Sequence, residues 1–267
     1  MTQLTGVCET LLMTLYCRAQ ETQRPDAIIR DEQAVKLVQQ ISHDFSKFED
    51  WKIQWGVAVR TQLIDAAAKR FLERFPDAVI VTLGAGLCTR FFRFNNGQAS
   101  WFSVDLLPVF PLWNQLIGES EHNRFITASV TDASWIKTIH EALKNRSSKR
   151  VLFIVEGLFM YLPEAEVKQV VWTLKKEFPG CEMVAEVVGD LIIRNPQLNR
   201  PVASTGARFV WGVHDCKVLE TWSPGITLLN QWFYADYHRD RQGWMHLLTY
   251  IPGFKQQLGK IGYFRLE

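Results

Sequence analysis

Residues 78–89 read AVIVTLGAGLCT, and most of the fold can be worked out from this stretch. Residues 78–83 form an unbroken apolar run rich in β-branched side chains, which is typical of a parallel strand buried on both faces of a sheet. The run leads directly into Gly84 and Gly86. Because glycine has no Cβ, the backbone can turn sharply there and approach a ligand closely. The stretch therefore predicts a buried strand that ends in a ligand-binding turn.

An acidic residue closes the next predicted strand, Ser100–Asp105 (SWFSVD). In an open α/β sheet, ligands bind at the carboxyl edge of the strands, so the Asp105 carboxylate would lie beside the glycine turn. There it could accept hydrogen bonds from both hydroxyls of an adenosine ribose, each contributing about 1.5–3 kcal/mol. The turn reads G-x-G-x-x-T, with Thr89 in place of a third glycine. This departure disfavours a dinucleotide-dependent oxidoreductase, because the third glycine allows close helix–strand packing beside a pyrophosphate.

Two further acids are predicted near this edge. Glu156 ends the strand predicted over Val151–Glu156 (VLFIVE), and Gly157 leaves room there for a ligand chain. Its carboxylate could face a cationic ligand group or form a buried pair with a backbone N–H or an arginine. Asp132 precedes a predicted helix, where it could cap the helix or bind an adenine amino group. The residues alone leave both alternatives open for each acid.

The rest of the chain alternates helices with strands, which predicts a parallel sheet covered by helices on both faces. An apolar stripe marks a helix within the first 75 residues; its members are Ile53, Val57, Ile64, Ala67, Phe71 and Phe75. Further helices are predicted after Asp132, from Pro163 and over residues 216–221. The remaining strands are predicted at residues 124–128, 182–188, 226–234 and 262–266. Residues 195–212 are predicted to form an irregular insertion or lid, and seven strands in all are expected.

Composition limits the possible classes of protein. The chain has 267 residues, 47% of them apolar and 22% charged, as in a globular protein with a large core. A formal charge of +2 is too balanced for an electrostatic nucleic-acid binder, and no long apolar run predicts a membrane span. Glu9 interrupts the N-terminal apolar stretch, so we expect no signal peptide. Five scattered cysteines without a C-x-x-C pair predict reduced thiols, no metal site and a cytoplasmic location.

Five segments together resemble the leucine carboxyl methyltransferase family, and in particular its small bacterial O-methyltransferases of polyketide biosynthesis. These segments are residues 5–12, 56–61, 83–93, 101–105 and 156–162. The resemblance continues more loosely through residues 194–196 and 232–236, so it covers nearly the whole chain. It implies a class I methyltransferase fold and S-adenosylmethionine as methyl donor. It also divides a single domain into a helical cap and first helix (residues 1–75), a cofactor-binding core (76–188), and a lid with terminal strands (189–267).

The resemblance assigns roles to the glycine turn and to the strand beside it. Gly84, Ala85 and Gly86 would let the loop pass under the methionine part of the cofactor. Asp105, followed by Leu106, would hold the ribose. Each of these roles is an implication of the family pattern at the matching position.

The resemblance also assigns the remaining cofactor contacts. Asp132 and Ala133 would meet the adenine, and Glu156 would face the methionine amino group. Arg60 would pair with the methionine carboxylate, and Arg18 is a weaker candidate for a similar charge in the cap.

Tyr161, just beyond the fourth predicted strand, is the expected substrate-side residue, with a packed aromatic side chain as the alternative. The family usually has an aspartate where this chain has Cys88, and its fifth strand usually ends in aspartate where Ala185 and Glu186 stand here. These departures concern the charge of the loop and the choice of substrate.

The expected function is methylation of a carboxyl or hydroxyl oxygen of a small metabolite, such as a polyketide-like compound. The alternatives are a protein C-terminal carboxyl methyltransferase, an inactive homologue that only binds the cofactor, and a dinucleotide-dependent oxidoreductase. A small-molecule substrate is expected, with no nucleic-acid or membrane partner. The sequence does not indicate an oligomeric state.

Overall fold

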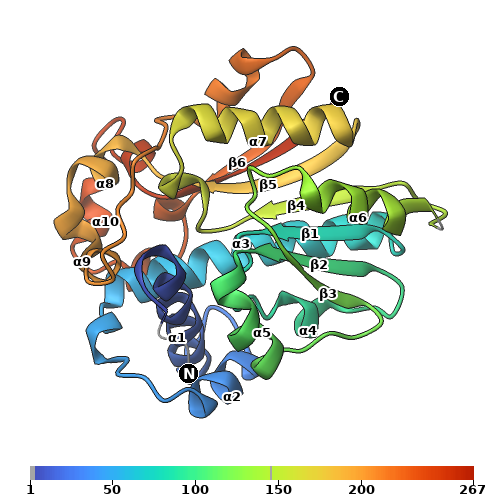
Figure 1. Cartoon of the computed structure of the whole chain (residues 1–267). Helices are drawn as coiled ribbons and strands as arrows, with labels where there is room; N and C mark the ends of the chain where they lie inside the picture. Colours follow the sequence, from blue (N-terminus) through green and yellow to red (C-terminus); the bar gives the residue numbers. More distant parts are fainter. Residues whose placement is uncertain (1–3, 145) are drawn as a thin grey trace.

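A single mixed sheet forms the centre of the computed structural model, which describes residues 4–144 and 146–267 (Figure 1). Its strand order is β3-β2-β1-β4-β5-β7-β6, and β7 runs antiparallel to both of its neighbours. The strands are β1 (Val79–Leu83), β2 (Ser100–Asp105), β3 (Asn123–Thr127), β4 (Val151–Val155), β5 (Cys181–Val187), β6 (Ile226–Phe233) and β7 (Lys260–Leu266). The predicted seven-stranded, mostly parallel sheet is therefore confirmed.

Helices cover both faces of this sheet. They are α1 (Thr10–Thr22), α2 (Glu32–Gln40), α3 (Trp51–Arg74), α4 (Arg90–Phe94), α5 (Phe110–Leu116), α6 (Ser134–Lys144), α7 (Glu164–Glu177), α8 (Asp190–Arg194), α9 (Arg200–Ala203) and α10 (Met245–Leu248). Figure 1 shows α6 and α7 on one side of the sheet and α3 and α4 on the other. Each face of the sheet packs against its helices through a hydrophobic core of its own. The short helices α8, α9 and α10 gather beside α1 at one end of the molecule.

All five residues of β1 are buried, which explains its unbroken apolar run. Val79, Val81 and Leu83 face the core under α6 and α7, whereas Ile80 faces the core under α3. A central parallel strand needs apolar side chains on both faces, and this one has them. The Gly84–Gly86 turn consequently begins at the middle of the sheet's carboxyl edge.

Helix α3 carries the predicted apolar stripe. Asp50 caps its start by accepting hydrogen bonds from the N–H groups of Lys52 (2.8 Å) and Ile53 (3.3 Å). The helix ends at Arg74, and Phe75 lies outside it with φ −137°. Phe75 is the C-cap and precedes proline, which disfavours helical backbone at that position, so the helix ends at the Phe75-Pro76-Asp77 segment.

The other predicted elements occur where they were expected, with strand ends displaced by one or two residues. The segment predicted as a short helix at residues 216–221 is a 3₁₀ helix, Cys216–Trp222, which begins where the Asp215 carboxylate accepts from the Lys217 N–H at 2.8 Å. The predicted lid region contains a 3₁₀ turn and the four-residue helix α9.

The N-terminal helices pack against the carboxyl edge of the sheet. Leu11 and Leu15 of α1 share a hydrophobic core with Leu87 of the glycine turn and with Val202 of α9. The cap and the lid therefore meet over the edge at which ligands bind in this class of fold.

No helix within residues 4–144 and 146–267 is long and apolar enough to cross a membrane. In the same ranges, no three His, Cys, Asp or Glu side chains gather in a way that could hold a metal ion. The five cysteines are free thiols.

The core under α6 and α7 provides a test of this packing. Phe153 is fully buried, with its ring centroid 5.1 Å from that of Phe178 and 6.1 Å from that of Trp135. We expect Phe153→Ala to lower the free energy of unfolding by about 3–5 kcal/mol, because the cavity left behind cannot fully collapse. Trp172→Ala, at a 47% exposed position of α7, should change it by only about 0.5 kcal/mol. Urea unfolding measures both, and similar losses would contradict the described packing.

Candidate active site

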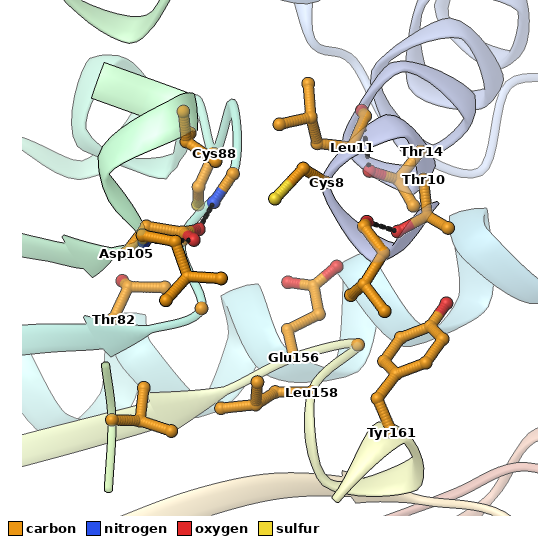
Figure 2. A pocket seen from close by; sticks show the side chains of 18 of the residues that line it. Cys8, Thr10, Leu11, Thr14, Thr82, Cys88, Asp105, Glu156, Leu158 and Tyr161 are labelled. Carbon is orange, nitrogen blue, oxygen red and sulfur yellow. Dashed lines mark hydrogen bonds between the residues drawn. The ribbon is translucent and has the colours of Figure 1, made fainter. Parts of the chain in front are cut away.

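A cavity of about 250 Å³ lies at the carboxyl edge of β1, β2 and β4. Figure 2 shows Asp105 and Cys88 on one side of it, Thr10 and Leu11 on the other, and Glu156 between them. Most of the residues predicted for the cofactor site line this cavity, namely Arg18, Arg60, Gly84, Ala85, Gly86, Asp105, Leu106 and Glu156. The fold thus brings together residues that are spread over nearly 140 positions of the sequence.

The glycine turn is shaped around the Asp105 carboxylate. Oδ2 of Asp105 accepts a hydrogen bond from the Gly86 N–H at 2.6 Å, and Oδ1 accepts one from the Leu106 N–H at 2.7 Å. Gly84 and Gly86 have φ values of +66° and +49°, which residues with a Cβ rarely adopt. A Cβ on Gly86 would also lie 2.9 Å from Cβ of Leu11. The turn therefore needs glycine both for its backbone conformation and for the close approach of α1.

Asp105 is held in a partly desolvated position. Burial raises the pKa of its carboxyl group above the ordinary value, and the two backbone N–H donors offset part of that rise. Each carboxylate oxygen has a second lone pair that the backbone does not use. The carboxylate can therefore still accept hydrogen bonds from a ligand.

Glu156 lies between two arginines. Its Oε1 accepts from Nε of Arg60 at 2.9 Å, and its Oε2 accepts from Nη2 of Arg90 at 2.7 Å. Burial by itself would raise the pKa of Glu156, but the guanidinium groups of Arg90 and Arg60 outweigh it and lower the pKa to about 2. Glu156 is thus an ionised, buried carboxylate. The arginine pairing left open in the sequence is the one that the structure contains.

The ion pairs continue from Glu156 into the N-terminal cap. Arg90 also binds Asp65 (Nε–Oδ1 2.6 Å), and Arg93 bridges Asp65 and Asp31 at 2.9 and 2.8 Å. Asp31 in turn pairs with Arg18 at 3.0 Å. Together with the pair of Arg60 and Glu186, these contacts make up seven ion pairs, which we call the buried ionic network; its members are Arg18, Arg60, Arg90, Arg93, Asp31, Asp65, Glu156 and Glu186. Removing one partner from a buried pair typically costs about 3–5 kcal/mol, so the network ties the cap firmly to the sheet edge.

Several members of the network were missed in the sequence. Arg90 and Arg93 stand in the segment that carries the family resemblance, but nothing in their spacing indicated a role. Asp31 caps α2 by accepting from the Ala34 N–H at 3.1 Å, so its local pattern was that of a helix start. Arg18 was a weaker candidate to pair with a charged group of the cofactor. In the structure its guanidinium group donates to Asp31 and, at 2.8 Å, to the carbonyl oxygen of Leu87.

Asp132 and Ala133 lie outside the lining of this cavity, and both side chains are exposed. The Asp132 carboxylate accepts from the Ser134 N–H at 2.9 Å, so it caps α6. The residues that reach the cavity at this end are Ala128, Ser129 and Val130. The residues that directly follow β3 line the cavity, whereas Asp132, which caps α6, does not.

A second cavity, of about 470 Å³, adjoins the first. Five residues line both cavities: Thr10, Thr14, Arg60, Gly157 and Tyr161. We call them the shared wall. The rest of the second cavity is mainly apolar, and its aromatic members are Trp55, Phe209, Tyr234, Trp244 and Phe254. Residues of α1, α3, α8, α9 and α10 contribute to it, so it exists only where the cap and the lid meet.

Tyr161 lies on the shared wall, as its predicted substrate-side role requires. Its ring makes an edge contact with Phe209, with centroids 5.0 Å apart. Burial raises the pKa of Tyr161 to about 12. At neutral pH the side chain is therefore a protonated phenol, which can donate a hydrogen bond but cannot serve as a base.

Glu186 was noted in the sequence only as a departure from the family pattern, yet it holds the shared wall together. Its Oε2 accepts from Nη1 of Arg60 at 3.0 Å and from the Gly157 N–H at 2.7 Å. Its Oε1 accepts from the Tyr234 hydroxyl at 2.8 Å. Glu186 lines the second cavity and not the first. In the sequence, the feature that could have indicated Glu186 was an acidic residue near the end of a predicted strand, at the edge of the sheet where ligands bind.

Residues 11–175 match the family model described as leucine carboxyl methyltransferase. The chain belongs to the leucine carboxyl methyltransferase family. It is accordingly an S-adenosylmethionine-dependent methyltransferase, as the resemblance in the sequence implied.

Curated relatives agree with this family membership. The chain is 34% identical over 239 residues to the tetracenomycin polyketide synthesis O-methyltransferase TcmP of Streptomyces glaucescens, covering 88% of this chain and 85% of that one. It is 27% identical over 265 residues to the S-adenosyl-L-methionine-dependent methyltransferase dpfgK of Gibberella zeae, covering 91% and 88%. The likeness to both relatives extends beyond the segment matched by the family model.

Solved structures show the same fold at low sequence identity. A DUF574 family protein from Streptomyces avermitilis superposes with a TM-score of 0.63 at 11% identity, covering 98% of both chains. A SAM-dependent methyltransferase from Anabaena variabilis superposes with a TM-score of 0.50 at 11% identity, covering 83% of this chain and 94% of that one. The class I methyltransferase fold predicted from the sequence is thus confirmed.

The contrast between Asp105 and Asp132 can be tested directly. We expect Asp105→Asn to weaken S-adenosylhomocysteine binding by about 10-fold or more, because two charge-assisted hydrogen bonds of about 1.5–3 kcal/mol each become neutral ones. Asp132→Asn should leave the affinity unchanged, since this side chain lies outside the cavity. Isothermal titration calorimetry measures both. A larger loss in Asp132→Asn than in Asp105→Asn would show that the assignment is wrong.

The raised pKa of Asp105 predicts a pH dependence. Hydrogen bonds from a ribose favour the ionised carboxylate, so affinity for S-adenosylhomocysteine should be full at neutral pH and fall as Asp105 becomes protonated. Because burial raises this pKa, the fall should begin above the ordinary aspartate range near pH 4. Glu156, with a pKa of about 2, stays ionised throughout. Calorimetry between pH 4 and pH 8 checks this, and the decline should be absent in Asp105→Asn.

Proposed function

We propose that this methyltransferase acts on a carboxyl or hydroxyl oxygen of a small, largely apolar metabolite with an aromatic or polyketide-like ring system. The observation that carries the proposal is the pair of adjoining cavities, one lined by charged groups and the glycine turn and the other by aromatic side chains. The relative TcmP, whose name places it in the synthesis of a polyketide, supports the acceptor class.

The first cavity is the proposed site of S-adenosylmethionine. The residues present fit this molecule: Asp105 offers unused lone pairs to a ribose, and a Cβ on Gly84 would lie 3.0 Å from Leu158 and fill the approach to the turn. Nη2 of Arg60 has no hydrogen-bond partner within the described part of the chain, which leaves it free for a methionine carboxylate. Glu156 keeps lone pairs for the amino group even with both of its arginine partners in place.

Two of the proposed contacts differ from the sequence expectation. Ala128, Ser129 and Val130 replace Asp132 and Ala133 beside the adenine, because they line the cavity. Arg18 supports the site through Asp31 and the Leu87 carbonyl, which engage its guanidinium group.

The chain's own contribution to the reaction is orientation and the exclusion of water. S-adenosylmethionine supplies an electrophilic methyl group, and in-line geometry with a well-placed acceptor is worth about 7–11 kcal/mol. Helix α1 lines both cavities and residues of the lid line the second, so together they limit the access of bulk water to the shared wall. Tyr161, protonated at neutral pH, can donate a hydrogen bond to the acceptor and hold its oxygen in place. No histidine among the described residues lines either cavity.

The acceptor class is tested with labelled methyl donor. We expect transfer from [methyl-³H]-S-adenosylmethionine to polycyclic aromatic acceptors that carry hydroxyl or carboxyl groups. A peptide ending in a free leucine carboxylate should not be methylated. Transfer to the peptide alone would favour the protein C-terminal carboxyl alternative and contradict the proposal.

The same assay examines Tyr161. Tyr161→Phe should lower kcat about 10-fold, because the acceptor oxygen loses a hydrogen bond worth about 0.5–1.5 kcal/mol together with part of its alignment. Tyr250→Phe is the matched control, since Tyr250 is 69% exposed and lines neither cavity. Equal activity of Tyr161→Phe and wild type would remove Tyr161 from the substrate side.

A further inference from the structure

We propose that Glu186 is a positioning residue for the methyl donor. Together with Tyr234 it fixes the guanidinium group of Arg60, so that the nitrogen Nη2 is held ready for the methionine carboxylate. This inference rests on the proposed function, because it takes the first cavity as the donor site and Arg60 as the partner of that carboxylate. Glu186 lines the second cavity and not the first, so it acts on the donor through Arg60.

Two of the three nitrogen atoms of the Arg60 guanidinium group are bound by carboxylates. Nε donates to Oε1 of Glu156 at 2.9 Å, and Nη1 donates to Oε2 of Glu186 at 3.0 Å. A guanidinium group is planar, and its N–H donors point in fixed directions. Two held nitrogen atoms therefore fix the orientation of the plane, and the direction of the third nitrogen, Nη2, follows from it. With Glu156 alone, the group could turn about a single hydrogen bond.

Glu186 can orient Arg60 because its own carboxylate is held from three sides. The residue is buried, at 4% exposure. Besides the bond from Arg60, its Oε2 accepts from the Gly157 N–H at 2.7 Å, and its Oε1 accepts from the Tyr234 hydroxyl at 2.8 Å. These three partners come from α3, from the turn after β4 and from the segment after β6. A carboxylate with donors from three separate segments has little freedom to rotate.

The Tyr234 hydroxyl can reach Glu186 because Gly259 leaves room for the tyrosine ring. A Cβ on Gly259 would overlap with Cε2 and Cδ2 of Tyr234. Burial, and after it the negative charge of Glu186, raises the pKa of Tyr234 well above its ordinary value. The hydroxyl therefore stays protonated and donates to Oε1 of Glu186.

The balance of charge indicates that Glu186 contributes orientation rather than net charge. The buried ionic network contains four arginines and four carboxylates, so its formal charge is zero. Arg90 shares the charge of Glu156 with Arg60, whereas Glu186 forms its one ion pair within the described residues with Arg60. The methionine part of the donor carries one ammonium and one carboxylate group, and so adds no net charge. Binding between two partners without net charge depends mainly on the directions of their hydrogen bonds.

The chain contains a matched control for Glu186 on the same strand. Glu182 stands four residues earlier in β5 and is equally buried, at 4% exposure. It too pairs with an arginine of α3, Arg74 (2.6 Å), and with a tyrosine hydroxyl, that of Tyr263. It lines neither cavity, because it lies at the opposite end of β5. Glu182→Gln therefore reproduces the loss of a buried carboxylate without touching Arg60 or either cavity.

The experiment compares two ligands, S-adenosylhomocysteine and 5′-methylthioadenosine, by isothermal titration calorimetry at pH 7. The second ligand keeps the adenosine and the sulfur but lacks the amino-acid part, so the ratio of the two affinities reports the contacts of that part. We expect Glu186→Gln to weaken S-adenosylhomocysteine binding about 10-fold and to change 5′-methylthioadenosine binding by less than about 2-fold, because the charge-assisted bonds that orient Arg60 are weakened. Tyr234→Phe, which alters no charge, should give the same split with a loss of about 3-fold. Glu182→Gln should leave both affinities unchanged.

The outcomes separate this inference from the proposed function. Equal losses for the two ligands in Glu186→Gln would indicate a general structural effect and overturn the positioning role. An unchanged ratio in a Glu186→Gln protein that is folded by circular dichroism would overturn it as well and leave the proposed donor site intact; should that variant not fold, Tyr234→Phe decides in the same way. Wild type that binds both ligands with equal affinity would contradict the proposed donor site itself, because nothing would then hold the amino-acid part.

Discussion

The contact on which the site depends is the buried pairing of Glu156 with Arg60 and Arg90. Each oxygen of this carboxylate receives a guanidinium N–H, at 2.9 and 2.7 Å, in a position from which water is largely excluded. An unpaired charge there would cost several kcal/mol, so all three side chains must keep their places together. They join the end of β4, the middle of α3 and the start of α4. Through Asp65 and Arg93, the same pairing reaches the N-terminal cap.

This arrangement gives the two cavities different characters. The sheet edge supplies the glycine turn, Asp105 and Glu156, which are polar and suited to a charged donor molecule. The cap and the lid supply aromatic and aliphatic side chains, which suit an apolar acceptor. Arg60 and Glu186 stand where the two environments meet. Because Arg60 lines both cavities, we expect a substitution at this residue to change both environments.

The site residues that the sequence predicts are those whose role follows from a local pattern. Asp105 is predicted because an acid at the end of a strand next to a glycine turn has few other uses. For Asp132 the pattern leaves two roles open, because an acid before a helix serves equally well as a cap, and the sequence offers no means of telling a cap from a ligand contact. Arg90 and Arg93 carried no local signal at all. Their partners come from distant segments, and a spacing rule cannot indicate pairs of that kind.

By itself the sequence determined the order of strands and helices, the glycine turn and the family, because apolar periodicity and glycine chemistry act between near neighbours. Only the tertiary structure decided which charges pair, since Arg60 is 96 residues from Glu156 and 126 from Glu186. It also decided that the cap and the lid close over an apolar cavity. Such a cavity is made of faces from five separate helices, and its lining depends on how those helices pack rather than on the order of residues within any one of them.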